Sequence, residues 1–316
     1  MAEPTETHYR ILTKAIAEGR VVPLLGAGVN LCGRPSEAGW QHGRYLPSAV
    51  ELAAHLADSF DFPPDELKDL LRVSQYVAVM LGSGPLYDEL HWLFDSDYQP
   101  TRVHTQLAAI PAFLRRHGLI RYQLIVTTNY DDALERAFSA AGEDFDLVIY
   151  IAEGQHRGKF LHVPPDGRSR LIERPNEYAA LSLATRTVIL KLHGAIDRRD
   201  AERDSYVITE DNYIDYLTRT DISNLVPVTL AARLRKSHFL FLGYSLADWN
   251  LRVILYRIWG EQALTYKSWA IQSNPKAIEE GFWRKRGVEI LHASLEEYID
   301  ALSVHLDELQ RVDVPS

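Results

Sequence analysis

Residues 21–30, VVPLLGAGVN, carry the group with the clearest chemical use in this chain, a glycine turn that directly follows an apolar run. Because Gly26 and Gly28 have no Cβ, backbone N–H groups in such a turn can approach a phosphate closely. A helix beginning there would direct its positive end at the same anion. The motif therefore indicates a nucleotide pyrophosphate as the first ligand to consider. The Gly-x-Gly pattern also occurs in plain tight turns, so its meaning depends on the residues downstream of it.

Polar side chains follow four later apolar runs, at the point where each run ends. The groups in question are Thr127–Asp132, His193–Gly194, Gly243–Asp248 and Gln272–Pro275. If the runs are parallel strands of one sheet, their carboxyl ends meet at one crevice. We therefore expect these groups to converge on a shared site.

Each group also has a plainer interpretation. Asn129 with Asp132, and Ser245 with Asp248, have the spacing of helix N-caps. His193 taken alone could be a buried histidine bonded to the backbone. The shared site is favoured because all of these residues are expected at the same edge of one sheet.

The elements that would position these groups alternate along the chain. Apolar runs predict strands at 21–25, 122–126, 147–151, 187–192, 238–242, 268–271 and 288–291. Helical patterns predict helices at 49–60, 66–81, 103–117, 131–141, 224–235, 247–259, 276–285 and 295–309. This order predicts an α/β fold with a doubly wound, mostly parallel, Rossmann-like sheet.

Two regions depart from simple alternation. Residues 49–117 are largely helical and form an excursion between the first two core strands. Residues 152–186 are rich in Gly, Pro, Arg and polar side chains, which favours a loop or small insertion over the active face, or a surface segment. Neither holds enough material for an independent domain, so we expect a single domain over residues 1–316.

Composition excludes several function classes. The chain has 316 residues, and its net charge of -9 argues against electrostatic binding of nucleic acid. Its one cysteine, Cys32, excludes disulfides within the chain and zinc sites built from four cysteines. The polar N-terminus is unlike a signal peptide, and no apolar run approaches the roughly 18 residues of a membrane span. We therefore expect a cytoplasmic protein without membrane contact.

Taken together, the motifs resemble the sirtuin superfamily. The matching segments, in the family's order, are GAGVN (26–30), TTNYD (127–131), KLHG (191–194), GYSLADWNLR (243–252) and the less specific AIQSNP (270–275). The similarity is greater to the sirtuin-like branch of bacterial anti-phage defence than to the protein deacylases, because the deacylases' four-cysteine zinc module is missing. The run YVITEDNY (206–213) also resembles that branch.

The resemblance implies NAD+ as the substrate, hydrolysis of its nicotinamide–ribose bond, and no metal. Asn129 would bind the nicotinamide ribose or position a water, His193 would be the general base, and Asp131 would orient Asn129 or the ribose. The residues implied in binding NAD+ are Gly26, Ala27, Gly28, Asn30, Thr128, Asp131, Gly243, Ser245, Asp248 and Asn274. The first three would hold the phosphates through their N–H groups.

Two other functions stay open, namely an NAD-dependent protein deacylase and a non-catalytic module that senses NAD or another nucleotide. A constitutively active NAD+ hydrolase would kill its host, so the resemblance also implies control. We expect a homo-oligomer or a separate sensor or activator protein, such as an ATPase or an Argonaute-like protein. The helices of 49–117 are a candidate interface, or else ordinary core.

Overall fold

The computed structural model describes residues 2–119, 121–218, 226–245, 255, 258 and 266–312. Its centre is a nine-stranded sheet. In spatial order the strands are β11 (Val288–His292), β10 (Ser268–Gln272), β9 (His238–Leu242), β1 (Val21–Leu25), β2 (Leu124–Thr127), β6 (Thr187–Lys191), β3 (Phe145–Tyr150), β4 (Phe160–Val163) and β5 (Arg170–Ile172). The strands from β11 to β3 are parallel, and β4 and β5 are antiparallel additions at one edge.

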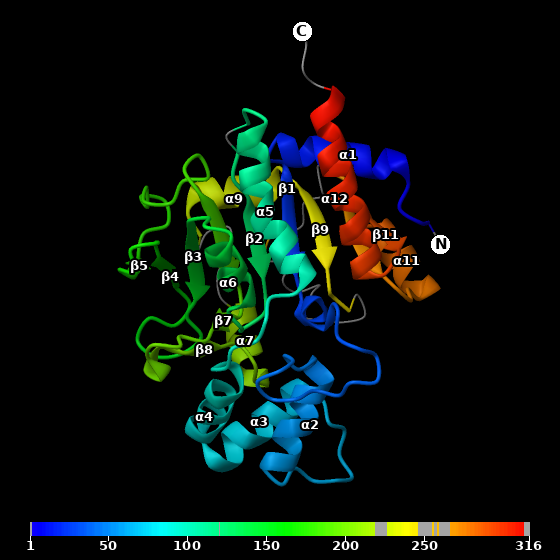
Figure 1. The fold of residues 1–316 in the computed structure, drawn as a ribbon. Helices are drawn as coiled ribbons and strands as arrows, with labels where there is room; N and C mark the ends of the chain where they lie inside the picture. Colours follow the sequence, from blue (N-terminus) through cyan, green and yellow to red (C-terminus); the bar gives the residue numbers. More distant parts are fainter. Residues whose placement is uncertain are drawn as a thin grey trace.

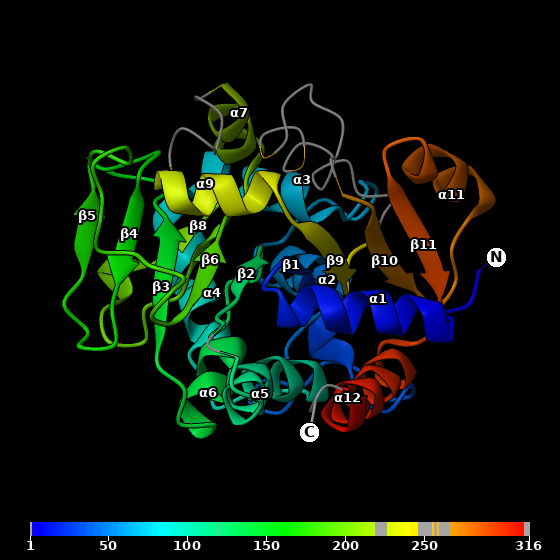
Figure 2. The same ribbon diagram turned by 90° about the horizontal axis from the view of Figure 1, so that it is seen from above.

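Helices cover both faces of this sheet, as the alternation predicts (Figure 2). One face is covered by α1 (Glu6–Ala17), α5 (Arg102–Arg116), α6 (Ala133–Ala140) and α12 (Leu295–Val312). The other face is covered by α9 (Val228–Arg235) and α11 (Ala277–Arg284). The expected doubly wound, mostly parallel fold is confirmed.

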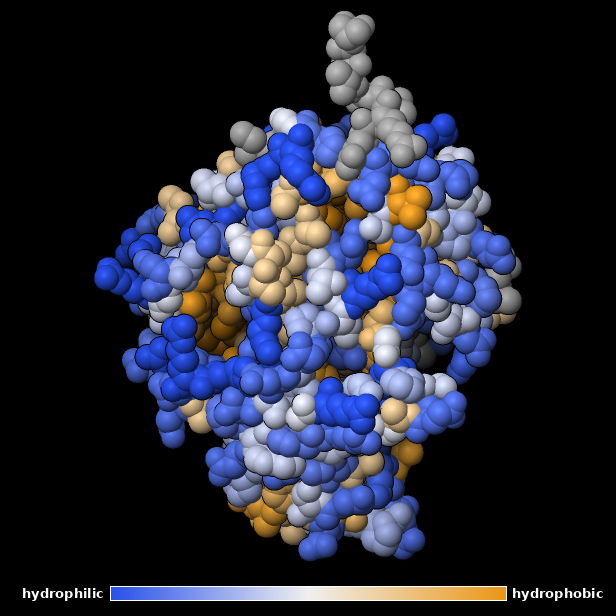
Figure 3. Space-filling view, viewed as in Figure 1, coloured by the Kyte–Doolittle hydropathy of each residue, from blue (hydrophilic) through white to orange (hydrophobic). Residues whose placement is uncertain are grey.

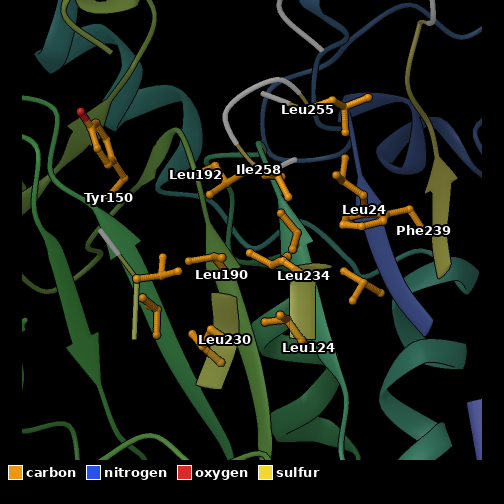
Figure 4. Packing of buried hydrophobic residues seen from close by; sticks show 14 of the residues in the cluster. Leu24, Leu124, Tyr150, Leu190, Leu192, Leu230, Leu234, Phe239, Leu255 and Ile258 are labelled. Atoms are coloured by element: carbon orange, nitrogen blue, oxygen red, sulfur yellow. The ribbon is translucent and has the colours of Figure 1, made fainter. Parts of the chain in front are cut away.

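Strand β1 illustrates why the core strands read as continuous apolar runs. All five of its residues are buried. Val22 and Leu24 pack in the cluster that includes α9 and α11, while Val21 and Leu25 pack in the cluster that includes α1 and α5. Burial on both faces removes the alternation of polar and apolar residues that a one-sided sheet shows. Figure 4 shows the first cluster, with residues of α9 lying against the leucines of β2 and β6.

The helical excursion lies beyond the carboxyl ends of the strands (Figure 1). It consists of α2 (Ala49–Ser59), α3 (Leu70–Leu81) and α4 (Ser83–Phe94), which share a core of their own with Tyr206 and Ile208. Helix α7 (Glu210–Thr218) packs against α3, where Gln75 and Asp211 exchange two hydrogen bonds of 2.8 and 3.0 Å. The predicted helix 103–117 is not part of this excursion, because α5 belongs to the layer on the sheet. The excursion therefore ends near residue 94.

Residues 152–186, expected as a loop, a small insertion or a surface segment, contain two strands that were not predicted. Strands β4 and β5 occupy part of this segment and extend the sheet past β3, at the edge farthest from β11 (Figure 2). The segment therefore does not form a loop over the active face. Both strands are short and are separated by Gly, Pro and Arg residues, so no apolar run marked them in the sequence.

The remaining short elements pack near the sheet's carboxyl edge. They are two 3₁₀ helices, η1 (Ala27–Leu31) and η2 (Ala201–Arg203), and a small antiparallel pair, β7 (Gly194–Ala195) and β8 (Ser205–Tyr206). The expected helix 247–259 lies outside the described residues, apart from Leu255 and Ile258, which are buried in the core.

The surface in Figure 3 is largely hydrophilic, with an apolar hollow over β3 beside α6. Within the described part of the chain, no helix is both long enough and apolar enough to cross a membrane.

Candidate functional site

A cavity of about 800 Å³ lies between the carboxyl edge of the sheet and the first turns of α2 and α3. Ligand sites in proteins commonly measure about 300–1,000 Å³. The cavity lies where the strand order reverses, because the chain continues from β1 to β2 on one side while β9 pairs with β1 on the other. Open α/β sheets bind ligands at such switch points.

Ten of the twelve predicted site residues line this cavity. They are Gly26, Ala27, Gly28, Asn30, Thr128, Asn129, Asp131, His193, Gly243 and Ser245. Asp248 lies outside the described residues. Asn274 is exposed and does not line the cavity, although its neighbours Gln272 and Ser273 do. Apart from the phosphate contacts expected of the Gly26 and Gly28 N–H groups, which are treated below, the roles assigned to these residues stay predictions.

The glycine turn packs directly against the backbone at the end of β9, with no side chain between them. The Gly28 N–H donates to the Gly243 carbonyl over 2.9 Å, and Gly243 has a φ of +72°. A Cβ on Gly243 would lie 2.3 Å from the Val29 nitrogen, and one on Gly28 would lie 2.7 Å from the Gly243 oxygen. Glycine is therefore required at both positions for the two strand ends to meet.

This packing corrects the expected role of the turn. The N–H groups of Gly26 and Gly28 donate to Leu242 and Gly243, each over 2.9 Å, so they serve the sheet edge and not a phosphate. The helix that begins there is the five-residue η1, a 3₁₀ helix. Ala27 lies between the glycines and lines the cavity, and phosphate binding by its N–H stays a prediction.

Asn129 is held next to this contact, by hydrogen bonds to the glycine turn and to the end of β2. Its Nδ2 donates to the Gly26 carbonyl over 3.3 Å, and its backbone N–H donates to Thr127 Oγ1 over 3.0 Å. Only 9% of the residue is exposed. With Nδ2 committed to Gly26, the amide oxygen is the atom that can accept a hydrogen bond from a bound molecule.

His193 follows β6 and is 4% exposed. Its Nδ1 lies 3.3 Å from the Tyr213 hydroxyl, and the rings of Tyr213 and Tyr216 lie nearly perpendicular to the imidazole. The next residue, Gly194, has a φ of +86° and passes so close to Ser205 that a Cβ would collide with it. Tyr213 was not among the predicted site residues, although it lies in the run YVITEDNY (206–213).

Asp131 orients Asn30 and not Asn129. Asn30 Nδ2 donates to Asp131 Oδ2 over 2.8 Å, and the Ala133 N–H donates to Asp131 Oδ1 over 3.1 Å. Asn30 Oδ1 is buried and has no hydrogen-bond partner among the described residues. A buried acceptor at a cavity wall is suited to a hydrogen-bond donor on a ligand.

Tyr244 and Gln272 complete the far side of the cavity; both belong to the polar groups expected at this edge, but neither was assigned a role. The Tyr244 hydroxyl lies 2.7 Å from Thr128 Oγ1, and Gln272 Nε2 donates to the Tyr244 carbonyl over 2.5 Å. These two contacts join the ends of β2, β9 and β10. The only feature of the sequence that indicated a place in the site for these two residues was their position after a predicted strand.

The helical wall of the cavity is fixed by ionic and capping contacts. Ser48 and Glu51 form a capping box at the start of α2, and Arg34 binds Glu51 through two nitrogens. The Arg34 guanidinium lowers the pKa of Glu51 to about 2. Asp69 caps α3 by accepting from the Leu71 N–H over 3.1 Å. Both helix starts are therefore satisfied by the chain's own side chains.

The buried His104 is connected to η1 through Thr101. His104 Nδ1 accepts from the Thr101 N–H over 3.0 Å, and Thr101 Oγ1 donates to the Val29 carbonyl over 3.0 Å. Burial lowers the pKa of His104 to about 4, so the ring is neutral at pH 7. In the part of the chain that the structure covers, no three His, Cys, Asp or Glu side chains are grouped to hold a metal ion.

Comparison with known families gives a match over slightly more than half of the chain. The family described as the SIR2-like domain matches residues 123–291. This range begins just before β2 and ends within β11. It includes Asn129, His193 and Gly243 but not the glycine turn.

The chain is also similar to curated proteins. It is 23% identical over 261 residues to "NAD(+) hydrolase ThsA" of Cytobacillus dafuensis, covering 82% of this chain and 42% of that protein. It is 23% identical over 290 residues to "Defense-associated sirtuin 2" of Bacillus subtilis, covering 90% and 24%. A ThsA of Acinetobacter baumannii (strain 532279) is 27% identical over 253 residues, covering 78% and 41%. The chain thus spans less than half the length of each relative.

Among solved structures, the chain is similar to two mutants of a Sir2 homologue in complex with ADP ribose. The mutant in which alanine replaces a serine gives a TM-score of 0.40, and the mutant in which alanine replaces a phenylalanine gives 0.43, both at 15% identity. Each comparison covers 96% of this chain and 99% of the other.

Proposed function

Since this chain belongs to the SIR2-like domain family, we propose that its cavity binds NAD+ and hydrolyses the bond between nicotinamide and ribose. The observation that carries the proposal is the meeting of Asn129 and His193, from two different strand ends, in one cavity at the switch point of the sheet. The names of two of the relatives, both NAD(+) hydrolases, support the same reaction.

The chemistry follows from the hydrogen bonds of these two residues. Cleavage of a glycosidic bond passes through a state in which the ribose carries positive charge. The amide oxygen of Asn129 accepts from a ribose hydroxyl or from the attacking water and stays uncharged throughout. His193 takes the proton of that water at Nε2, while the electron pair of the broken bond leaves with nicotinamide.

For Nε2 to accept the proton, Nδ1 of His193 must carry the ring hydrogen. The Tyr213 hydroxyl, 3.3 Å from Nδ1, is the acceptor that favours this tautomer. General-base catalysis of this kind typically contributes a factor of about 10²–10⁴ to the rate. Tyr213 therefore affects the reaction indirectly, by favouring the reactive tautomer of His193.

The remaining cavity residues would bind the substrate. The buried Oδ1 of Asn30 is suited to accept from a ribose hydroxyl, and the Ala27 N–H is suited to a phosphate oxygen. Thr128 and Ser245 supply further hydroxyl groups on the same wall. No step of this mechanism uses a metal.

We further propose that the protein depletes NAD+ as an effector of bacterial anti-phage defence. The name "Defense-associated sirtuin 2" supports this setting. An NAD+ hydrolase needs control in its host, and we propose that assembly with other copies of the chain, or a separate sensor such as an ATPase or an Argonaute-like protein, provides it.

The test is incubation of the purified protein with NAD+ over a series of protein concentrations, with nicotinamide and ADP-ribose followed by chromatography. We expect both products in equal amounts, with a rate per molecule that rises with protein concentration. Nicotinamide release that requires an acyl-lysine peptide would instead indicate a deacylase. Binding of NAD+ without turnover at every concentration, also with the separate activator protein present, would indicate a sensing module.

A further inference from the structure

Lys191 is a charged residue in the middle of the sheet. It ends β6, a strand whose five residues are all buried, and only 1% of its side chain is exposed. In the parallel pairing of β2 with β6, Lys191 lies opposite Thr127, the last residue of β2. The turn that carries Asn129 begins at the next residue. A buried ammonium group costs free energy unless it is fully paired, so its contacts need an explanation.

The Lys191 ammonium makes three contacts, and two of them are with that turn. Nζ donates to the backbone carbonyls of Asp131 and of Tyr130, the latter at 3.4 Å. The third contact is an ion pair with Glu135 Oε1 on α6, at 2.7 Å. Lys191 therefore joins the end of β6, the Asn129 turn and the helix that comes after the turn.

An ion pair that served only to stabilise the fold would need Glu135 alone. Here the ammonium is also committed to main-chain carbonyls one and two residues beyond Asn129. The same Lys191 is two residues before His193 in the chain. Its side chain thus adds to the backbone bonds from the Leu192 N–H to Thr127 and from the Ile196 N–H to Tyr130, and it reaches the Asp131 carbonyl as well.

We propose that Lys191 is a positioning residue that sets the relation between Asn129 and His193 by holding the carbonyls of residues 130 and 131. This inference rests on the proposed function for its catalytic consequence, but the geometric part is independent of it. The turn has two amides that report its conformation. The Asn129 N–H donates to Thr127 Oγ1, and the Ala133 N–H donates to Asp131 Oδ1.

The experiment separates the turn contacts from the ion pair. Glu135→Gln keeps Lys191 and a hydrogen-bond acceptor for it, so the bonds to the turn persist. Lys191→Met combined with Glu135→Gln removes the bonds to the turn without leaving an unpaired buried charge. We expect the double variant to unfold at a temperature no lower than that of Glu135→Gln, whose buried ammonium lacks its charged partner, to lose at least tenfold in kcat relative to it, and to keep its KM for NAD+ within about threefold.

Amide hydrogen exchange is measured on the same proteins. We expect faster exchange at Asn129 and Ala133 in the double variant than in Glu135→Gln, with exchange in β1 and β9 unchanged. Equal kcat and equal exchange in the two variants would overturn the proposal, because Lys191 would then serve only as the partner of Glu135. If the wild-type protein releases no nicotinamide, alone or with its separate activator, the proposed function fails, and the exchange comparison still decides the positioning role.

Lys191→Arg provides a second route in case the double variant does not fold. The guanidinium keeps the charge next to Glu135 but presents its donors in a planar fork, unlike a compact ammonium. We expect this variant to fold, with faster exchange at Asn129 and a reduced kcat. Wild-type exchange and kcat in this variant would contradict the proposal.

Discussion

The N–H of Gly28 and the carbonyl of Gly243 form a 2.9 Å hydrogen bond that joins the ends of β1 and β9 through backbone atoms alone. The two residues are far apart in the chain, and no side chain takes part in the bond. This contact forms one wall of the cavity and sets the position of Gly26, whose carbonyl holds Asn129. The site therefore depends on two glycines that need not touch a ligand.

We predict that Gly243→Ala destabilises the protein by at least about 3 kcal/mol. The residue has a φ of +72°, and its added Cβ would lie 2.3 Å from the Val29 nitrogen, which is backbone and cannot move aside. The matched control is Gly281→Ala in α11, where a Cβ meets nothing within 4 Å. That control should stabilise by about 0.5–1 kcal/mol. Chemical denaturation measures both, and equal stability of the two variants would contradict the account of this backbone contact.

Tyr213→Phe should lower kcat by about tenfold, since the His193 ring loses the hydroxyl that favours its reactive tautomer. Tyr178→Phe is the matched control, because the Tyr178 hydroxyl lies 2.7 Å from Nδ1 of another histidine, His162, outside the cavity. Each variant removes one tyrosine–histidine contact and should cost about 1 kcal/mol of stability. Rates of nicotinamide release that fall equally in both, or in neither, would remove the role assigned to Tyr213.

Stability should fall on acidification between about pH 6.5 and pH 4, in part through His104. Burial lowers its pKa in the folded protein from the ordinary 6.5 to about 4, so the unfolded chain binds the proton first. The stabilisation is therefore complete above pH 6.5 and is lost as the pH falls towards 4, by on the order of 3 kcal/mol. His104→Gln should have a flatter pH profile of unfolding free energy in this window. A profile parallel to that of the wild type would contradict the assignment.

Asn30→Ala should weaken NAD+ binding by about tenfold, which corresponds to about 1.4 kcal/mol. The variant removes the buried Oδ1 acceptor and leaves Asp131 Oδ2 without its 2.8 Å partner. Asn176→Ala, at an exposed position outside the cavity, is the control and should bind as the wild type does. Calorimetry with NAD+ makes the comparison, and unchanged affinity in Asn30→Ala would exclude Asn30 from the binding wall.

The sheet could be predicted because its strands are buried on both faces. Runs such as 21–25 and 238–242 are apolar at nearly every position, and the predicted bounds equal those of β1 and β9. Helix α4 and strands β4 and β5 escaped prediction for a different reason. Helix α4 begins with Ser83, Gly84 and Pro85 directly after α3, so the helical pattern of 66–81 hid its start, and β4 and β5 are short strands separated by Pro and Gly.

The candidate site was predictable as a set of positions but not as a set of contacts. Residues that come after parallel strands converge because of topology, so Asn129 and His193 could be brought together from the sequence alone. The partner of Asp131 could not be predicted, since Asn30 is 101 residues away and reaches it only through the turn of η1. Nor could the sequence indicate that the N–H groups of Gly26 and Gly28 are used by β9 and the residue after it.

The central claim is that Asn129 and His193 together cleave NAD+, and release of nicotinamide by matched variants tests it most directly. Asn129→Ala and His193→Ala are compared with Asn176→Ala and His156→Ala, the same substitutions at exposed positions outside the cavity. We predict that each variant of the first pair loses at least about 100-fold in kcat. Both variants should still unfold at a temperature close to that of the wild type. The second pair should release nicotinamide at the wild-type rate. Undiminished release by either variant of the first pair would contradict the account, as would no release by a wild-type protein that binds NAD+ and is assayed with its separate activator.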